Sequence, residues 1–112
     1  MRNLILVAAA LAVTAMAATT AFAATRTVRV GDNYFVRARG VPTVTVKRGD
    51  TVKWRFAGRE PHNVRATGGP VRFTSPIRRS GTYRRRMTRR GTYTIVCTIH
   101  GARDQRMKLV VR

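Results

Sequence analysis

The histidine and cysteine side chains of this sequence are its strongest candidate ligands for a transition metal, and there are three of them: His62, Cys97 and His100. Cys97 and His100 are separated by two residues, a spacing short enough to place both on one metal ion. A thiolate and two imidazoles, completed by a weak axial group, form the ligand set of a blue copper electron-transfer site. The residue types therefore predict one copper ion that cycles between Cu2+ and Cu+, provided that His62 reaches the other two ligands.

Alternating apolar and polar residues predict the strands that position these ligands. The alternation is clearest in residues 52–56, where three large apolar residues are separated by two basic ones. It recurs in residues 28–30, 43–47, 92–97 and 107–112. Short strands separated by glycine-containing turns are typical of one antiparallel sandwich or barrel. In a sandwich, strand ends from different hairpins meet at one pole. His62 follows one predicted strand and Cys97 ends another, so we expect them at such a pole.

The arginine-rich segment 81–90 breaks this pattern. If Tyr83 and Met87 both face the core, Arg85 lies between them on the same face. An arginine at an inward position is tolerated where the strand bulges, lies at a sheet edge, or lets the side chain reach outward to water. We therefore expect one of these three arrangements in this segment.

The first 23 residues match the pattern of an export signal. Arg2 precedes an apolar run over residues 4–18, and Ala21-Phe22-Ala23 has the small residues of a cleavage site. The alternative is an uncleaved membrane-spanning helix, for which the run is nearly long enough. We expect cleavage, which gives a signal peptide over residues 1–23, one domain over residues 24–112 and no retained transmembrane segment. The protein is then exported, and it is secreted, periplasmic or held in the cell envelope.

The 112 residues include 23 lysines and arginines against four acidic residues, a formal net charge of +19. So few carboxylates argue against a carboxylate-rich active site or a calcium cage. A field of this sign steers a protein toward anionic partners, which outside the cytoplasm means an acidic redox protein or an anionic cell-envelope surface. We expect nucleic acid to bind only non-specifically, because no aromatic platform and no groove-binding helix accompanies the arginines.

Three segments resemble the plastocyanin-like blue copper proteins, or cupredoxins. Residues 44–54 are similar to the strand–turn–strand unit before that family's first ligand. Pro61-His62-Asn63-Val64 resembles the first-ligand loop, and residues 90–100 resemble the segment with the second and third ligands. The resemblance implies a Greek-key β-sandwich that carries single electrons and is not itself an enzyme, with His62, Cys97 and His100 as copper ligands. We expect it to be a monomer.

The axial ligand is where this chain departs from the family. The usual methionine lies five positions after the second histidine in plastocyanin, and Gln105 occupies that position here. We favour Gln105 because an amide oxygen is an accepted axial ligand; Met107 is then a core residue of the last strand. If the ligand loop is longer, Met107 is the axial group instead. By the same resemblance, Asn63 ties the two ligand loops together and Thr98 supplies its hydroxyl partner.

Two further departures concern the ligand loops. Phe56-Ala57-Gly58 replaces a polar, asparagine-containing loop of the family, and Ile99 stands where plastocyanin has proline. Both changes affect groups that hydrogen-bond to the ligands, so they leave the bonding around the metal and its reduction potential open.

Other uses of the same residues stay open at this point. A structural zinc site usually needs four strong ligands, and only Asp104 could supply the fourth. A transpeptidase would use Cys97 as nucleophile, His62 or His100 as base and Arg103 near the oxyanion. A third alternative is a copper-carrying or metal-free protein of the same fold, whose arginine-rich surface binds an envelope polymer or nucleic acid.

Overall fold

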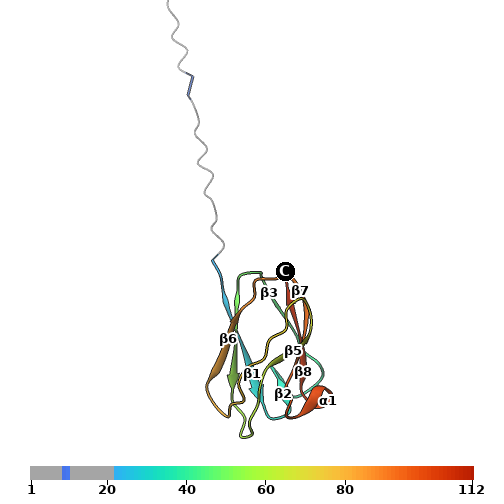
Figure 1. The fold of residues 1–112 in the computed structure, drawn as a ribbon. Coiled ribbons are helices and arrows are strands. Elements are labelled where there is room, and N and C mark those ends of the chain that lie inside the picture. Colours follow the sequence, from blue (N-terminus) through green and yellow to red (C-terminus); the bar gives the residue numbers. More distant parts are fainter. Residues whose placement is uncertain (1–8, 11–21) are drawn as a thin grey trace, which may run out of the picture.

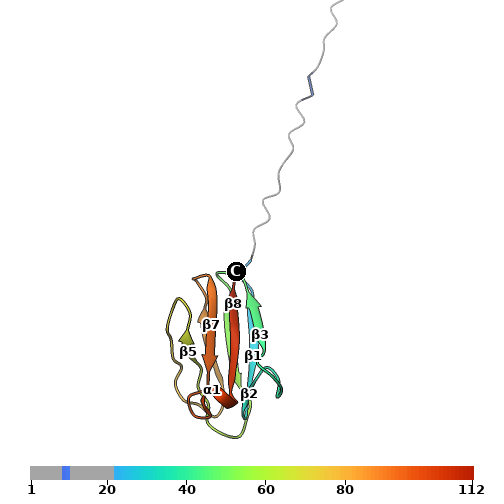
Figure 2. The ribbon, with the colours of Figure 1, turned by 90° about the vertical axis from the view of Figure 1, so that its right-hand side faces the viewer.

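Backbone hydrogen bonds join the strands of this chain into two sheets, and apolar side chains that face inward pack these sheets against each other. The computed structural model describes residues 9–10 and 22–112, and the eight strands in these residues form two four-stranded sheets packed face to face (Figure 1). In chain order the elements are β1 (Thr25–Gly31), β2 (Tyr34–Phe35), β3 (Thr43–Val46), β4 (Thr51–Phe56), β5 (Arg65–Gly68), β6 (Thr82–Arg86), β7 (Gly91–Val96), α1 (Gly101–Asp104) and β8 (Arg106–Val111). One sheet has the order β2-β1-β4-β6, and the other, seen face on in Figure 2, has the order β3-β8-β7-β5. The predicted all-β sandwich is confirmed.

The alternation places one face of each long strand in the core. In β4, Val52, Trp54 and Phe56 are buried while Arg55 is exposed. The inward residues of β1, β3, β7 and β8 belong to the same cluster: Val28, Val30, Val44, Val46, Tyr93, Ile95, Met107, Leu109 and Val111. Full burial of one such side chain stabilises a fold by about 1.5–3 kcal/mol. The packed core therefore fixes the strand ends from which the loops at the two poles begin.

The pairing within the sheets is mixed, whereas the sequence predicted an antiparallel sandwich. β1 and β4 pair in parallel, and so do β3 and β8. The pairs β1–β2, β4–β6, β5–β7 and β7–β8 are antiparallel. The chain crosses from one sheet to the other after β2 and again after β3, so β1 and β4 become neighbours without a hairpin between them. Local alternation carries no information on these crossings.

β6 lies at a sheet edge, which is one of the three arrangements expected for the arginine-rich segment. Arg85 is half-buried, and its guanidinium carbon lies 4.5 Å from the centre of the Phe73 ring. This contact with an aromatic face compensates in part for the water that the guanidinium loses. The edge position leaves the rest of the side chain a path to solvent.

The two ends of the sandwich carry different features. The turn between β3 and β4 lies beside the C-terminus, where the Arg48 amide donates to the Arg112 carbonyl at 2.7 Å. α1 lies at the opposite pole (Figure 1). No helix within the described residues is long and apolar enough to cross a membrane. Apart from residues 9–10 and 22–23, the predicted export signal falls outside the described residues.

Candidate metal centre

The three predicted ligands come from two loops at the α1 pole. His62 lies in the loop after β4, where its backbone amide and carbonyl both bond to the backbone of Arg78. Cys97 directly follows β7, and His100 immediately precedes α1. The Gly101 amide donates to the Cys97 carbonyl at 2.9 Å and closes this second loop. Gly101 has a φ of 80°, a left-handed conformation that glycine adopts without strain.

The side chains of His62, Cys97 and His100 converge. Sγ of Cys97 lies 3.8 Å from Nδ1 of His62 and 3.6 Å from Nδ1 of His100. The three ligand atoms all lie within 4.8 Å of one another. His62 and Cys97 are fully buried, whereas the side chain of His100 remains 14% exposed. A thiolate and two imidazoles at these separations suit one transition-metal ion of the copper or zinc type.

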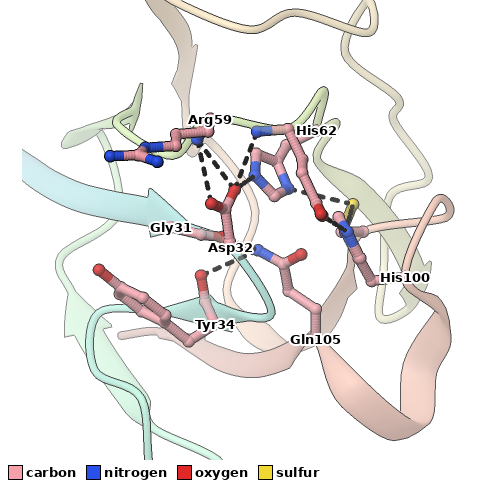
Figure 3. A network of polar contacts seen from close by, with 9 residues as sticks. Gly31, Asp32, Tyr34, Arg59, His62, His100 and Gln105 are labelled. Carbon is pink, nitrogen blue, oxygen red and sulfur yellow. Dashed lines mark hydrogen bonds and ion pairs between the residues drawn. The ribbon is translucent and has the colours of Figure 1, made fainter.

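A carboxylate lies within hydrogen-bond distance of the outer nitrogen of each imidazole, and Figure 3 shows the contact between Asp32 and His62. His62 Nε2 lies 2.9 Å from Asp32 Oδ1, and His100 Nε2 lies 2.5 Å from Glu60 Oε2. An ionised carboxylate only accepts hydrogen bonds, so each Nε2 of a neutral ring carries the hydrogen. The lone pair of each Nδ1 then faces the sulfur, which is the arrangement that a shared metal ion requires.

The loop before His62 keeps Asp32 in its charged form. The backbone N–H groups of Arg59 and Glu60 donate to the Asp32 carboxylate at 3.1 Å, and the His62 ring adds a further bond. These hydrogen bonds outweigh the effect of burial and lower the pKa of Asp32 to about 2. A full negative charge therefore faces the outer edge of the His62 ring at neutral pH.

Gly58 makes the contact between Asp32 and His62 possible. A Cβ at this position would lie 2.1 Å from Asp32 Oδ1 and 2.9 Å from His62 Nε2, far inside contact distance. The absence of a side chain at Gly58 thus leaves the space in which the Asp32 carboxylate approaches the His62 imidazole.

Cys97 is surrounded by groups that favour its thiolate. Burial raises the pKa of the thiol, but the backbone N–H groups of Asn63 and His100, together with both imidazoles, lower it to about 7. Contact with Cys97, reinforced by Glu60 and opposed by burial, raises the pKa of His100. Since the thiolate is the form of cysteine that binds metals, the site is suited to a cation at neutral pH.

Gln105 has a fully buried side chain with one unsatisfied atom. Its Nε2 donates to the carbonyls of Gly31 and Tyr34 at 2.8 and 2.9 Å. Its Oε1 is buried without a partner among the described residues and lies on the side of the two histidines (Figure 3). A buried carbonyl oxygen costs free energy unless a donor or a cation satisfies it. Met107, the other axial candidate, lies opposite Ile95 in the core.

Asn63 and Thr98 join the two ligand loops. Asn63 Nδ2 donates to Thr98 Oγ1 at 2.9 Å, and the Thr98 amide donates to Asn63 Oδ1 at 2.8 Å. Asn63 is buried next to His62, and Thr98 follows Cys97. The pair therefore couples the position of one ligand to that of the other.

Asp32 and Glu60 are the residues at this site that the sequence does not single out. Each lies far along the chain from the histidine that it contacts, by 30 and 40 positions respectively. A contact between residues so far apart in sequence cannot be predicted from local residue spacing. The one available signal is composition, because acidic residues are rare in this chain and each is therefore worth locating.

The comparisons with known proteins point to one family. No protein-family model and no curated protein matches the chain. Among solved structures, an amicyanin mutant with glutamine in place of a methionine, in its Cu(I) state, is 32% identical, with a TM-score of 0.62. That match covers 79% of this chain and 82% of the amicyanin chain. This chain belongs to the blue copper cupredoxins. The predicted resemblance is confirmed.

Two further neighbours define how far the likeness extends. An oxidised amicyanin mutant with glycine in place of a proline is 32% identical, with a TM-score of 0.59, and the match covers 88% of both chains. The copper-containing nitrite reductase of Thermus scotoductus SA-01 is 21% identical, with a TM-score of 0.62. The match covers 77% of this cupredoxin but 22% of the reductase, so it shows a shared fold alone. The family and the His62–Cys97–His100 cluster together support copper binding and, at the level of the family, electron transfer.

Proposed function

We propose that this cupredoxin is an exported one-electron carrier, not itself an enzyme, that binds one copper ion. The observation that carries the proposal is the convergence of Cys97 Sγ with Nδ1 of His62 and of His100, all within 4.8 Å. The donor set fits copper better than structural zinc, because zinc usually takes four strong ligands and Asp104 makes no contact with this cluster in the described structure. When bound, copper supplies a couple between Cu2+ and Cu+.

Cys97, His62 and His100 have distinct parts in this proposal. The Cys97 thiolate favours Cu+, while the two imidazoles suit both oxidation states. The sandwich anchors both loops, and the Asn63–Thr98 pair fixes them to each other. Small movement of the ligands on electron transfer keeps the reorganisation energy low, which a carrier needs.

We assign the axial position to Gln105 Oε1 and keep Met107 in the core. Support comes from the unpartnered buried oxygen of Gln105 and from the apolar surroundings of Met107. Because an amide oxygen is harder than a thioether sulfur, it favours Cu2+ and lowers the reduction potential relative to a methionine site.

The electron leaves through His100 in this proposal. His100 is the partly exposed ligand, and Ile99 beside it is 42% exposed. Pro61 and Ala102 complete an apolar margin, which suits close contact with a partner protein. The basic side chains nearby, Arg59 and Arg103 among them, are exposed and would attract an acidic redox partner.

Stoichiometric reduction tests the carrier function. Anaerobic titration of the copper-loaded protein with a one-electron reductant should consume one electron per chain, and reoxidation by an acidic redox protein should return the starting spectrum. Consumption of more than one electron, or continued turnover of a small substrate such as nitrite, would contradict it.

The export part of the proposal rests on residues 1–23 and has its own test. Expression of the full chain in a bacterium should give a mature protein that begins at Ala24, and mass spectrometry measures this directly. Size-exclusion chromatography of the same material should give a monomer. An intact N-terminus on membrane-bound protein would contradict export with cleavage.

A further inference from the structure

The placement of the acidic residues is unusual for so basic a chain. The four acidic residues are Asp32, Asp50, Glu60 and Asp104, against 23 lysines and arginines. Within the described residues, both ion pairs involve a histidine and neither involves an arginine or lysine: Asp32 with His62, and Glu60 with His100. Despite the excess of competing cations, half of the carboxylates of the chain contact the outer nitrogens of the two histidines.

The Asp32 contact is built into the backbone. Two backbone N–H groups hold its carboxylate at 3.1 Å, and Gly58 leaves the space that a side chain would fill. Glu60 lies in the same loop and reaches the second ligand loop, where it meets His100. One short loop before His62 therefore orients the carboxylates for both imidazoles.

We propose that Asp32 and Glu60 are positioning residues that hold both imidazoles with Nδ1 toward the metal, and that their charges favour Cu2+ over Cu+. The inference rests on the proposed copper function and adds to it what sets the potential. A carboxylate on the outer nitrogen of a ligating histidine fixes the tautomer and raises the basicity of the ligand. Two negative charges near the metal also stabilise the more highly charged ion.

The two carboxylates and the net charge of the whole chain have opposite effects on the reduction potential of the copper ion. A net charge of +19 favours the less positive metal ion and so raises the reduction potential. Most of that charge is spread over exposed arginines and is screened by salt, whereas Asp32 and Glu60 touch the ligands. Asp32 contacts a fully buried histidine. The Glu60 side chain is 56% exposed, so we expect the larger effect from Asp32.

Four proteins compared by spectroelectrochemistry test the proposal: wild type, Asp32→Asn, Glu60→Gln and the control Asp104→Asn. Asp104 lies in α1 near the site and is exposed. Asparagine and glutamine keep an oxygen for Nε2–H but remove the charge. For Asp32→Asn we expect the ratio of Cu+ to Cu2+ affinity to rise about tenfold, an upward shift of about 59 mV. Glu60→Gln should raise the reduction potential by a smaller amount. Asp104→Asn should change the potential less than either of these variants does.

A second measurement tests the positioning role of Asp32 in copper-free protein, by determining which nitrogen of His62 carries the hydrogen. Nitrogen NMR of the imidazoles at a pH where His62 is neutral should show its hydrogen on Nε2 in wild type. Asp32→Ala, which lacks the acceptor, should shift His62 toward a mixture of tautomers. A hydrogen on Nδ1 in wild type would overturn the positioning role.

The outcomes separate this inference from the proposed function. Wild-type protein that develops no copper–thiolate absorption overturns both. Copper-loaded variants of Asp32 and Glu60 whose potentials equal that of Asp104→Asn overturn the inference and leave the copper function intact. Upward shifts in both variants, with the Nε2 hydrogen on His62, support the inference.

Discussion

At the scale of single residues, our assignment of the axial position rests on Gln105. Its Nε2 is bonded to two carbonyls, so its Oε1 is the atom directed away from them and left without a partner in the described structure. For Gln105→Met we expect a higher reduction potential, because a thioether stabilises Cu+ better than an amide oxygen does. Protein-film voltammetry measures the shift, and an unchanged or lower potential would contradict the assignment.

Met107→Leu is the matched control for that experiment. Met107 is fully buried in β8, and leucine conserves its volume and apolar character. The substitution should leave the potential unchanged and cost less than about 1.5 kcal/mol in the free energy of unfolding. A shift confined to Met107→Leu would assign the axial position to Met107 instead.

The sequence predicts the three metal ligands because histidine and cysteine are rare in this chain and because two of the three ligands lie close together in sequence. Cys97 and His100 lie in one loop, and His62 is the other histidine of the chain. Residue type and local spacing do not predict the contacts of Asp32 and Glu60 with the two histidines. Their contacts depend on how two distant loops meet, which in turn depends on the space beside Gly58.

At the scale of elements, Asp50 joins the turn between β3 and β4 to the start of β1. Its carboxylate accepts from the backbone N–H of Ala24 at 2.9 Å and of Lys47 at 2.8 Å. These bonds lower the pKa of Asp50 from its ordinary value of 3.8. Since the native state binds the proton less readily than the unfolded chain, the stabilisation is complete above about pH 4 and is lost as the pH falls through the native pKa.

Denaturant unfolding of wild type and Asp50→Asn at a series of pH values tests this point. The variant should be less stable at pH 6, and the difference should shrink below pH 4 as the wild-type carboxylate takes up its proton. The turn lies at the pole opposite the candidate metal centre, so the copper spectrum should be unchanged. A difference in stability that stays constant with pH would contradict the assigned role.

Alternation predicts which faces of the long strands turn inward, and it does so for β4, β7 and β8. It fails for the short elements. β5 has four residues and a register shift at Ala66 and Gly68, and α1 has four residues, so neither displays a period. Parallel pairing is also beyond local pattern, because it follows from where the chain crosses between sheets.

At the scale of the whole molecule, we expect the net charge of +19 to govern how the protein meets a partner. Exposed arginines near His100, such as Arg59 and Arg103, should steer an acidic redox protein toward the exposed ligand. We expect the second-order rate of electron transfer to fall at least about tenfold as ionic strength rises from about 0.01 to 0.15 M. Stopped-flow mixing measures the rate, with a neutral small-molecule oxidant as the control. A flat dependence with the acidic protein would contradict steering.

The binding of copper by Cys97, His62 and His100 is the claim on which the rest depends. One equivalent of Cu2+ added to the copper-free protein should produce thiolate-to-copper absorption in the visible red that saturates at one ion per chain. Cys97→Ser should lose this absorption while circular dichroism shows that the sandwich is retained. Wild-type protein that stays colourless, or absorption that survives in Cys97→Ser, would contradict the account.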